Sequence, residues 1–366
     1  MRLRGLVLLL GVCAWHVPAG ICQAKNVSSA GLKLALEIAA AQDPAPKSPV
    51  PDPQAIKYPT RRGAAAGQAY SHYLKGLIYS EDGSYGKALE ELVAAKKLDP
   101  RSLHIRLKLS TILIRMGDVE KAEKELKEAK RIDSQNLDAS LALLFLYSYR
   151  NDEPRIDSEY EYFLEKSNKI NPDDLKISEY LGQFYFYKGR YKEAADIYKT
   201  IVEKNPEYAE GLFWLGYFYE ELSRHKDAIA VWEKSVKLAP DYAPALNSLG
   251  YVYAEENVRL DEAEAMIQKA LAQEPQNGAY LDSLGWVYFK KKDNVNAEKY
   301  LLSAIEALKD PVIYAHLGDL YVSLDKTEEA VKFYKEGLDN FPDDKDLKKK
   351  LETYGKAGRK DKIVEK

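Results

Sequence analysis

A period of about 34 residues constrains what this chain can fold into more than any other feature of its sequence. Five glycines lie 34, 34, 35 and 33 residues apart, and each follows a leucine and precedes a tyrosine by three residues: Gly182, Gly216, Gly250, Gly285 and Gly318. Four prolines repeat with spacings of 34, 34 and 35 residues: Pro172, Pro206, Pro240 and Pro275. Self-similarity at a fixed period of this length indicates an array of small structural units that stack on one another.

The residue types within each period predict a pair of helices. The leucine, glycine and tyrosine recur at helical spacing and give the first helix an apolar stripe. An alanine follows each glycine by about twelve residues, and both residues are small enough to let two helices approach closely. Proline lacks an N–H group and disfavours helix in the residue before it, so it ends the second helix. The residues predicted to pack the pairs together are Gly76, Gly182, Gly216, Gly250, Gly285, Gly318, Ala194, Ala228, Ala263, Ala297 and Ala330.

These positions resemble the tetratricopeptide repeat family, whose unit is two antiparallel helices. The resemblance covers residues 69 to about 344 and implies an all-α fold, a right-handed α-solenoid of about eight helix-turn-helix repeats. The repeats are expected to begin near Ala69, Leu103, Leu137, Leu175, Ala209, Ala243, Gly278 and Pro311. The third repeat has Leu144 at the glycine position, Tyr160 at the alanine position and a four-residue insertion. We therefore expect it to form a wider joint between two blocks of repeats.

Composition excludes several classes of protein. The 366 residues carry a formal net charge of −3, which gives no argument for nucleic acid as a partner. A hydrophobic content of 46% is too high for a disordered chain. Both cysteines, Cys13 and Cys22, lie near the start, so the body of the chain is neither a disulfide scaffold nor a zinc ribbon.

The first 24 residues are typical of a secretory signal peptide. Arg2 and Arg4 precede an apolar stretch at residues 6–17, and residues 22–24 (Cys-Gln-Ala) resemble a cleavage site. This pattern predicts export with cleavage after Ala24, and together with the family resemblance it implies the periplasm. A membrane anchor is less consistent with the pattern, because about a dozen apolar residues fall short of the roughly 20 that span a bilayer. A lipid anchor at Cys22, on the periplasmic face of the outer membrane, is the other alternative.

Both ends of the chain fall outside the repeat pattern. Residues 25–68 are predicted to hold a short apolar helix at 28–42 and then a proline-rich linker. Residues 345–366 carry nine Lys or Arg and four Asp or Glu, and predict a polar basic helix or tail that caps the array. We expect the 28–42 helix to dock on apolar groove positions of the first three repeats, with a membrane-proximal spacer as the alternative. Those groove positions are Tyr73, Leu77, Leu107, Ile114, Leu141 and Phe145.

No cluster of residues predicts catalysis or cofactor binding. The histidines after the leader are each alone in their repeat and lack the spacing of a metal site: His72, His104, His225 and His316. The sequence has no glycine-rich phosphate loop, and its paired acids are expected at solvated helix ends. We therefore predict a protein that is not an enzyme and that has no cofactor and no metal site.

The resemblance implies a binding surface instead. In tetratricopeptide repeat proteins the first helices line a concave face, chiefly through their second, fifth, ninth and twelfth residues. Here those positions hold aromatic rings flanked by acids and an amide, which favours a groove for a peptide or helical segment of a partner. The predicted groove residues are Phe186, Phe213, Tyr217, Asn247, Tyr251, Asp282, Trp286, Phe289 and Asp319. The alternative is that these rings only pack against their neighbours.

Leader and repeats together predict an exported, non-catalytic scaffold that binds other proteins of the bacterial cell envelope. The resemblance implies a role in assembling an envelope, secretion, pilus or polysaccharide machine. Two alternatives are a lipid-anchored outer-membrane assembly factor and a glycan-binding accessory protein that uses Trp286.

Overall fold

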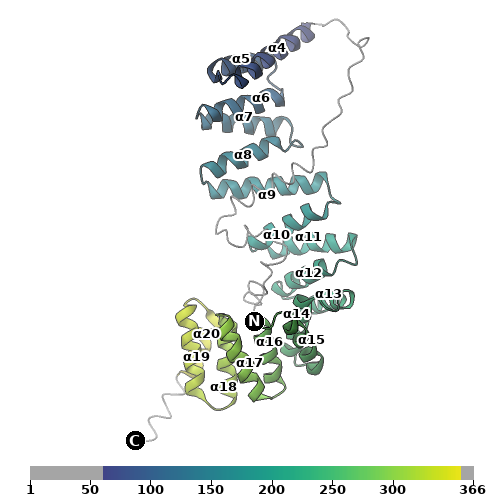
Figure 1. The fold of residues 1–366 in the computed structure, drawn as a ribbon, viewed down its shortest axis with the longest axis vertical. Coiled ribbons are helices and arrows are strands. Elements are labelled where there is room, and N and C mark those ends of the chain that lie inside the picture. Colours follow the sequence, from purple (N-terminus) through teal and green to yellow (C-terminus); the bar gives the residue numbers. More distant parts are fainter. Residues whose placement is uncertain (1–60, 356–366) are drawn as a thin grey trace. The chain divides into compact units, whose positions relative to one another are not determined.

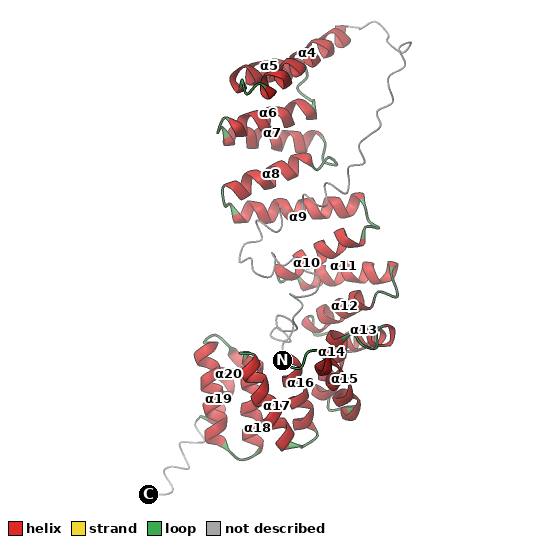
Figure 2. Ribbon diagram, in the orientation of Figure 1, coloured by secondary structure: helices red, strands yellow, loops and turns green. Residues whose placement is uncertain are grey.

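Helices make up all the regular structure in residues 61–355, the part of the chain that the computed structural model describes (Figure 2). The leader, the 28–42 segment, most of the linker and residues 356–366 lie outside the described residues. The chain divides into two compact units, whose described parts are residues 61–181 and 182–355. They are called here the amino-terminal unit and the carboxyl-terminal unit. Their boundary lies inside α10 (Leu175–Tyr187).

The amino-terminal unit contains three antiparallel helix pairs (Figure 1). The second helix of the first pair contacts the first helix of the second pair, and the second and third pairs are joined in the same way. The pairs are α4 (Arg61–Glu81) with α5 (Tyr85–Leu98), α6 (Leu103–Arg115) with α7 (Val119–Ile132), and α8 (Asp138–Tyr149) with α9 (Glu153–Ile170).

The carboxyl-terminal unit continues the same alternation and ends with a single helix. After α11 (Tyr191–Lys204) come the pairs α12 (Ala209–Glu221) with α13 (His225–Leu238), α14 (Ala243–Glu255) with α15 (Leu260–Gln273), α16 (Gly278–Lys290) with α17 (Asn294–Ala307), and α18 (Pro311–Ser323) with α19 (Thr327–Asn340). The last helix within the described residues is α20 (Lys345–Tyr354), which contacts both α18 and α19.

The predicted all-α repeat solenoid is confirmed, and most first helices begin within one residue of the expected positions. Two differences have local causes. The first is that α4 begins at Arg61 instead of near Ala69, because three alanines in residues 61–68 favour helix over the linker that the sequence pattern predicted there. The second is that α9 has 18 residues where other second helices have 14, so the four-residue insertion of the third repeat lengthens this helix.

Close packing within each pair explains the regular spacing of small residues along the chain. A Cβ atom at Gly76 or Gly285 would lie 2.7 Å from a leucine of the second helix, and one at Gly182 would lie 2.6 Å from Tyr198. A Cβ atom at Gly250 would lie 2.8 Å from Ile267, and one at Gly216 or Gly318 would lie closer still to the ring of Trp232 or Tyr334. The five alanines predicted to pack opposite are fully buried: Ala194, Ala228, Ala263, Ala297 and Ala330.

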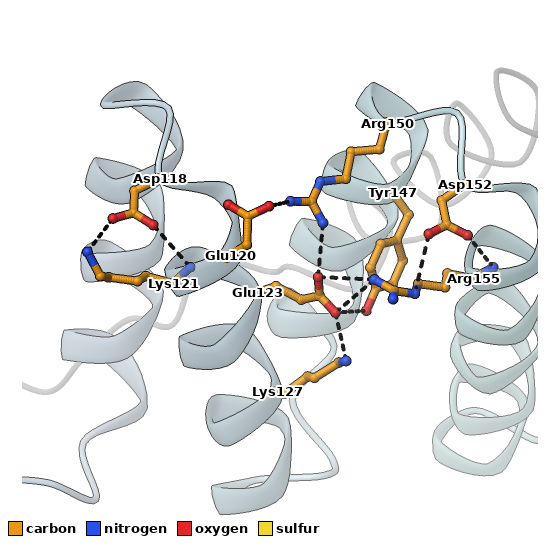
Figure 3. A network of polar contacts seen from close by, with 9 residues as sticks. All are labelled: Asp118, Glu120, Lys121, Glu123, Lys127, Tyr147, Arg150, Asp152 and Arg155. Carbon is orange, nitrogen blue, oxygen red and sulfur yellow. Dashed lines mark hydrogen bonds and ion pairs between the residues drawn. The ribbon is translucent and has the colours of Figure 1, made fainter.

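The third repeat belongs to the amino-terminal unit, and the boundary between units lies beyond it instead of through it. A network of charged groups holds this repeat to the second (Figure 3). The carboxylate of Glu123 on α7 accepts hydrogen bonds from Tyr147 and Arg150 at 3.3 Å each and from Arg155 at 3.2 Å. Its ion pair with Lys127 measures 2.7 Å. Because Tyr147 and Arg155 come from α8 and α9, one carboxylate of α7 ties both helices of the third repeat.

Candidate partner-binding face

First helices of successive pairs lie next to one another in the carboxyl-terminal unit, since α16 contacts both α14 and α18. The predicted groove residues lie on one side of these helices, and this side is called here the first-helix face. Six of the nine predicted residues are buried within the folded chain: Phe213, Tyr217, Asn247, Tyr251, Asp282 and Trp286. Phe186, Phe289 and Asp319 are half-buried.

At the start of the carboxyl-terminal unit the predicted residues form an aromatic cluster. The ring of Phe186 lies perpendicular to that of Tyr217, with centroids 5.7 Å apart, and also contacts the indole of Trp214 at 5.8 Å. Phe213 packs edge-on against Tyr242 at 5.6 Å. These rings stabilise one another, and only Phe186 among the predicted three keeps a partly exposed surface.

Further along the same face, three successive first helices bring an acid, an indole and an imidazole together. The Asp282 carboxylate on α16 lies 2.9 Å from Nδ1 of His316 on α18. The imidazole stacks on Trp286, with ring centroids 3.9 Å apart, and Phe289 stacks on the same indole at 4.7 Å. The indole N–H of Trp286 donates to the carboxylate of Glu255 on α14.

The carboxylates around His316 outweigh the effect of its burial. Burial by itself lowers the pKa of an imidazole, but the charges of Asp282, Glu255 and Asp319 and the hydrogen bond with Asp282 leave the pKa of His316 raised. Burial also raises the pKa of Asp310, at the start of α18, to about 6, even though the backbone N–H of Val312 donates to its carboxylate. The pair of Asp282 and His316 is therefore a buried, charge-assisted hydrogen bond.

Several polar atoms on the first helices α14 and α18 are buried without a hydrogen-bond partner. They are Oδ1 and Nδ2 of Asn247 on α14 and Nε2 of His316 on α18. Folded proteins pair nearly all of their buried polar atoms, so each exception calls for an explanation. An amide with a free donor and a free acceptor can bind both polar groups of a peptide backbone.

Asp319, the last predicted groove residue, already has partners within the chain. Its carboxylate accepts a hydrogen bond from Tyr334 at 2.8 Å and from Lys350 of α20 at 2.7 Å. The contact therefore joins the end of the first-helix face to the last helix of the unit.

Sequence reasoning missed His316 as a member of this face. It treated each histidine as alone in its repeat, whereas His316 meets Asp282 of the preceding repeat. The separation of 34 residues between them, one full period, is the signal that could have found the pair.

Other kinds of site are not evident in residues 61–355. In that range, no group of three or more histidine, cysteine, aspartate or glutamate side chains is arranged to hold a metal ion. Nor does any helix there combine the length and apolar character needed to cross a bilayer.

The stacked helix pairs define the class of this protein as an α-helical repeat solenoid. Tetratricopeptide repeat models match residues 79–144, 181–243, 252–311 and 312–344, more than half of the chain. The chain therefore belongs to the tetratricopeptide repeat family. Members of this family bind proteins through the repeats, generally without catalysis, and the chain is a protein–protein interaction scaffold.

Solved structures with similar folds include a thermophilic tetratricopeptide repeat protein of Thermus thermophilus, at 24% identity and a TM-score of 0.44, covering 49% of this chain and 98% of that one. A tetratricopeptide repeat protein of Parabacteroides merdae is 17% identical, with a TM-score of 0.41 and coverages of 79% and 99%. The Cut9–Hcn1 complex of APC/C is 18% identical, with a TM-score of 0.48 and coverages of 74% and 52%. No curated protein matches the chain in sequence.

Proposed function

We propose that the first-helix face of α14, α16 and α18 binds an extended segment of a partner protein in the bacterial cell envelope. The observation that carries this proposal is the set of unpartnered polar atoms on Asn247 and His316. A buried polar atom without a partner costs about 1–3 kcal/mol. Both side chains are fully buried in the folded chain, so the covering side chains must move aside before a bound backbone can pair with these atoms. That pairing would then offset the cost and favour binding.

The neighbouring groups favour a neutral or basic partner segment over an acidic one. Asp282 and Glu255 are carboxylates, and each is already engaged by one donor, His316 or Trp286. The predicted face has Asn247 but none of the basic residues that would hold a terminal carboxylate, so an internal or basic segment fits better. Stacking of His316 and Phe289 on Trp286 leaves the indole less suited to a sugar ring.

Substitution of Asn247 by leucine tests whether this side chain contributes to the affinity for the partner without contributing to the stability of the fold. Leucine has the same branching as asparagine but no polar atoms, so Asn247→Leu should leave the free energy of unfolding unchanged or raise it by about 1–3 kcal/mol. The same variant should bind the partner at least about tenfold more weakly, because one pair of backbone hydrogen bonds is lost. The partner is first captured in cells by a photocrosslinker at half-buried Phe289, and its affinity for each purified variant is then measured.

Asn340→Leu is the matched control, because Asn340 is exposed on the second helix α19. It should leave affinity unchanged. Equal affinity of the wild type and Asn247→Leu would refute the proposed role of this face, and so would a large loss of stability in Asn247→Leu.

The envelope setting is a proposal that rests on the leader, whose residues lie outside the described part of the chain. Export with cleavage after Ala24 places the scaffold in the periplasm, where it would help to assemble an envelope, secretion, pilus or polysaccharide machine. Mass spectrometry of the amino terminus of the mature protein distinguishes cleavage after Ala24 from a lipid on Cys22. A chain that keeps residues 1–24 and remains in the cytoplasm would contradict the proposal.

A further inference from the structure

The first helix of the array exposes an apolar strip. Tyr70, Leu74 and Ile78 of α4 have exposed fractions of 61%, 39% and 63%. Residues four apart lie on the same side of a helix, so the three side chains form one strip, called here the α4 ridge. The opposite side of α4 packs on α5 through buried Ala69 and Gly76.

The corresponding position is buried in every later repeat. Counted from the repeat start, Ile78 is the tenth residue, and the tenth residues of the later repeats are all buried: Ile112, Leu146, Phe184, Phe218, Val252, Val287 and Leu320. First helices α6, α8, α12, α14, α16 and α18 each contact the second helix of the pair before them. Among the described residues no pair precedes α4, so Ile78, at one end of the ridge, lies where such a second helix would pack.

We propose that residues 32–41 of this chain form a short helix that packs on the α4 ridge and acts as an amino-terminal cap. The segment reads LKLALEIAAA, and its two charged residues, Lys33 and Glu37, are four apart. A helix of this sequence places both charges on one side and turns a broad apolar side to its neighbour. These residues lie outside the described part of the chain.

The intervening chain is long enough to allow this contact. Residues 42–60 form a proline-rich stretch, and 19 residues in an extended proline-type conformation span up to about 60 Å at roughly 3.1 Å each. The 21 residues of α4 measure only about 30 Å at 1.5 Å per residue. The segment can therefore reach any point of the ridge.

The size of the ridge favours a tethered occupant over a second copy. Three side chains cover much less than the roughly 1,200 Å² that a specific protein–protein interface buries. A segment joined to α4 by a linker binds instead at a high effective concentration, so a small contact area suffices.

Hydrogen exchange of the full chain, followed by mass spectrometry, tests the cap. In the wild type the amides of residues 32–41 should exchange at least about tenfold more slowly than in an unprotected chain. Ile78→Asp should abolish this protection while the amides of α5 stay protected, because Ile78 is exposed and its loss leaves the core intact. Ile78→Leu, which keeps the apolar side chain, should retain the protection.

Phe145→Asp is the control that distinguishes this site from the apolar groove positions predicted for the first three repeats, of which Phe145 is 45% exposed. It should leave the protection of residues 32–41 unchanged. Loss of protection in Phe145→Asp, or its persistence in Ile78→Asp, would overturn the proposed site. Unprotected amides in the wild type, or protection that rises with protein concentration, would overturn it too, because another molecule would then cover the ridge.

Discussion

Gly216 illustrates how one missing atom fixes the distance between two helices. A Cβ atom at this position would collide with the indole of Trp232, which is fully buried. The indole cannot simply turn away, because its N–H donates to the backbone oxygen of Phe213 at 3.0 Å. The close packing of the two helices therefore offsets the unfavourable helix propensity of glycine.

Gly216→Ala should lower the free energy of unfolding by about 1–3 kcal/mol, because the added methyl group overpacks the contact with Trp232. Gly86→Ala is the control, since Gly86 also lies in a helix but has no atom within 4 Å of an added Cβ. That variant should be neutral or more stable by up to about 1 kcal/mol. Urea unfolding measures the free energy of unfolding of the two variants. Equal changes in both variants would contradict the packing argument.

Asp310 is the residue whose ionisation should change stability near neutral pH. Its folded pKa of about 6 lies above the ordinary value of 3.8, so the folded chain holds this proton more tightly than the unfolded chain does. The resulting stabilisation is complete below about pH 4 and is lost as the pH rises through about 6.

Asp310→Asn keeps the helix cap but removes the titrating group. Relative to the wild type, the variant should gain about 1–3 kcal/mol of unfolding free energy between pH 4 and pH 7, since two pKa units correspond to roughly this range. Urea unfolding at a series of pH values measures the difference. A difference that does not change with pH would mean that Asp310 ionises normally in the folded protein.

At the scale of helices, recurring polar contacts join neighbouring pairs, in addition to the small residues that pack each pair. In three consecutive repeats the motif tyrosine three residues after the glycine donates to a glutamate on the second helix of the preceding pair: Tyr253 to Glu233 at 2.6 Å, Tyr288 to Glu264 at 2.9 Å, and Tyr321 to Glu298 at 2.6 Å. The spacing of these tyrosines predicted an apolar stripe, and their rings do pack along the first helices. Their hydroxyl groups serve a second purpose that the helical period alone does not reveal.

Glu123 has more polar partners than any of these three glutamates. It therefore allows a test of the polar contacts between α7, α8 and α9. Burial opposes its ionisation, but the hydrogen bond from Lys127 and the charges of Lys127 and Arg155 lower its pKa on balance. Glu123→Gln should therefore lower the unfolding free energy by about 1–3 kcal/mol at pH 7. The difference should shrink as the pH falls below about 4.5, because the native carboxylate then takes up a proton.

Glu120→Gln is the matched control for that measurement. Glu120 also pairs with Arg150, but its side chain is 80% exposed, so the change should cost no more than about 0.5 kcal/mol. If both variants lose the same stability, the network of Figure 3 acts as an ordinary surface ion pair.

At the scale of the whole molecule, stability is a sum of contacts between neighbours, as expected for a repeat protein. The carboxyl-terminal unit ends in α20, whose Leu347 is fully buried in the cluster that contains Tyr334 and Leu317. Lys350 of the same helix pairs with Asp319 at 2.7 Å. The last repeat therefore depends on α20 for its outer covering.

Deletion of residues 345–366 should speed hydrogen exchange in α18 and α19 while leaving α12 and α13 nearly unchanged, because contacts do not extend across several repeats. Deletion of residues 356–366 alone keeps α20 and should change neither region. Faster exchange throughout residues 182–344 would show instead that the unit unfolds as one block.

The repeat, the helix pairs and the small residues within them could all be predicted from the sequence, because a strict period exposes every position that packing restricts in the same way. The resemblance to the family also implied a binding face on the first helices, and that face stays a prediction. The side chains that meet across repeats could not be predicted: Asp282 with His316, Trp286 with Glu255, and Glu123 with Tyr147 and Arg155 of the two helices of the next repeat. Such contacts depend on the rotation of one pair against the next, a three-dimensional quantity that the linear period does not contain. For the same reason the sequence pattern assigned Trp286 to a groove, whereas stacking between neighbouring helices buries its ring.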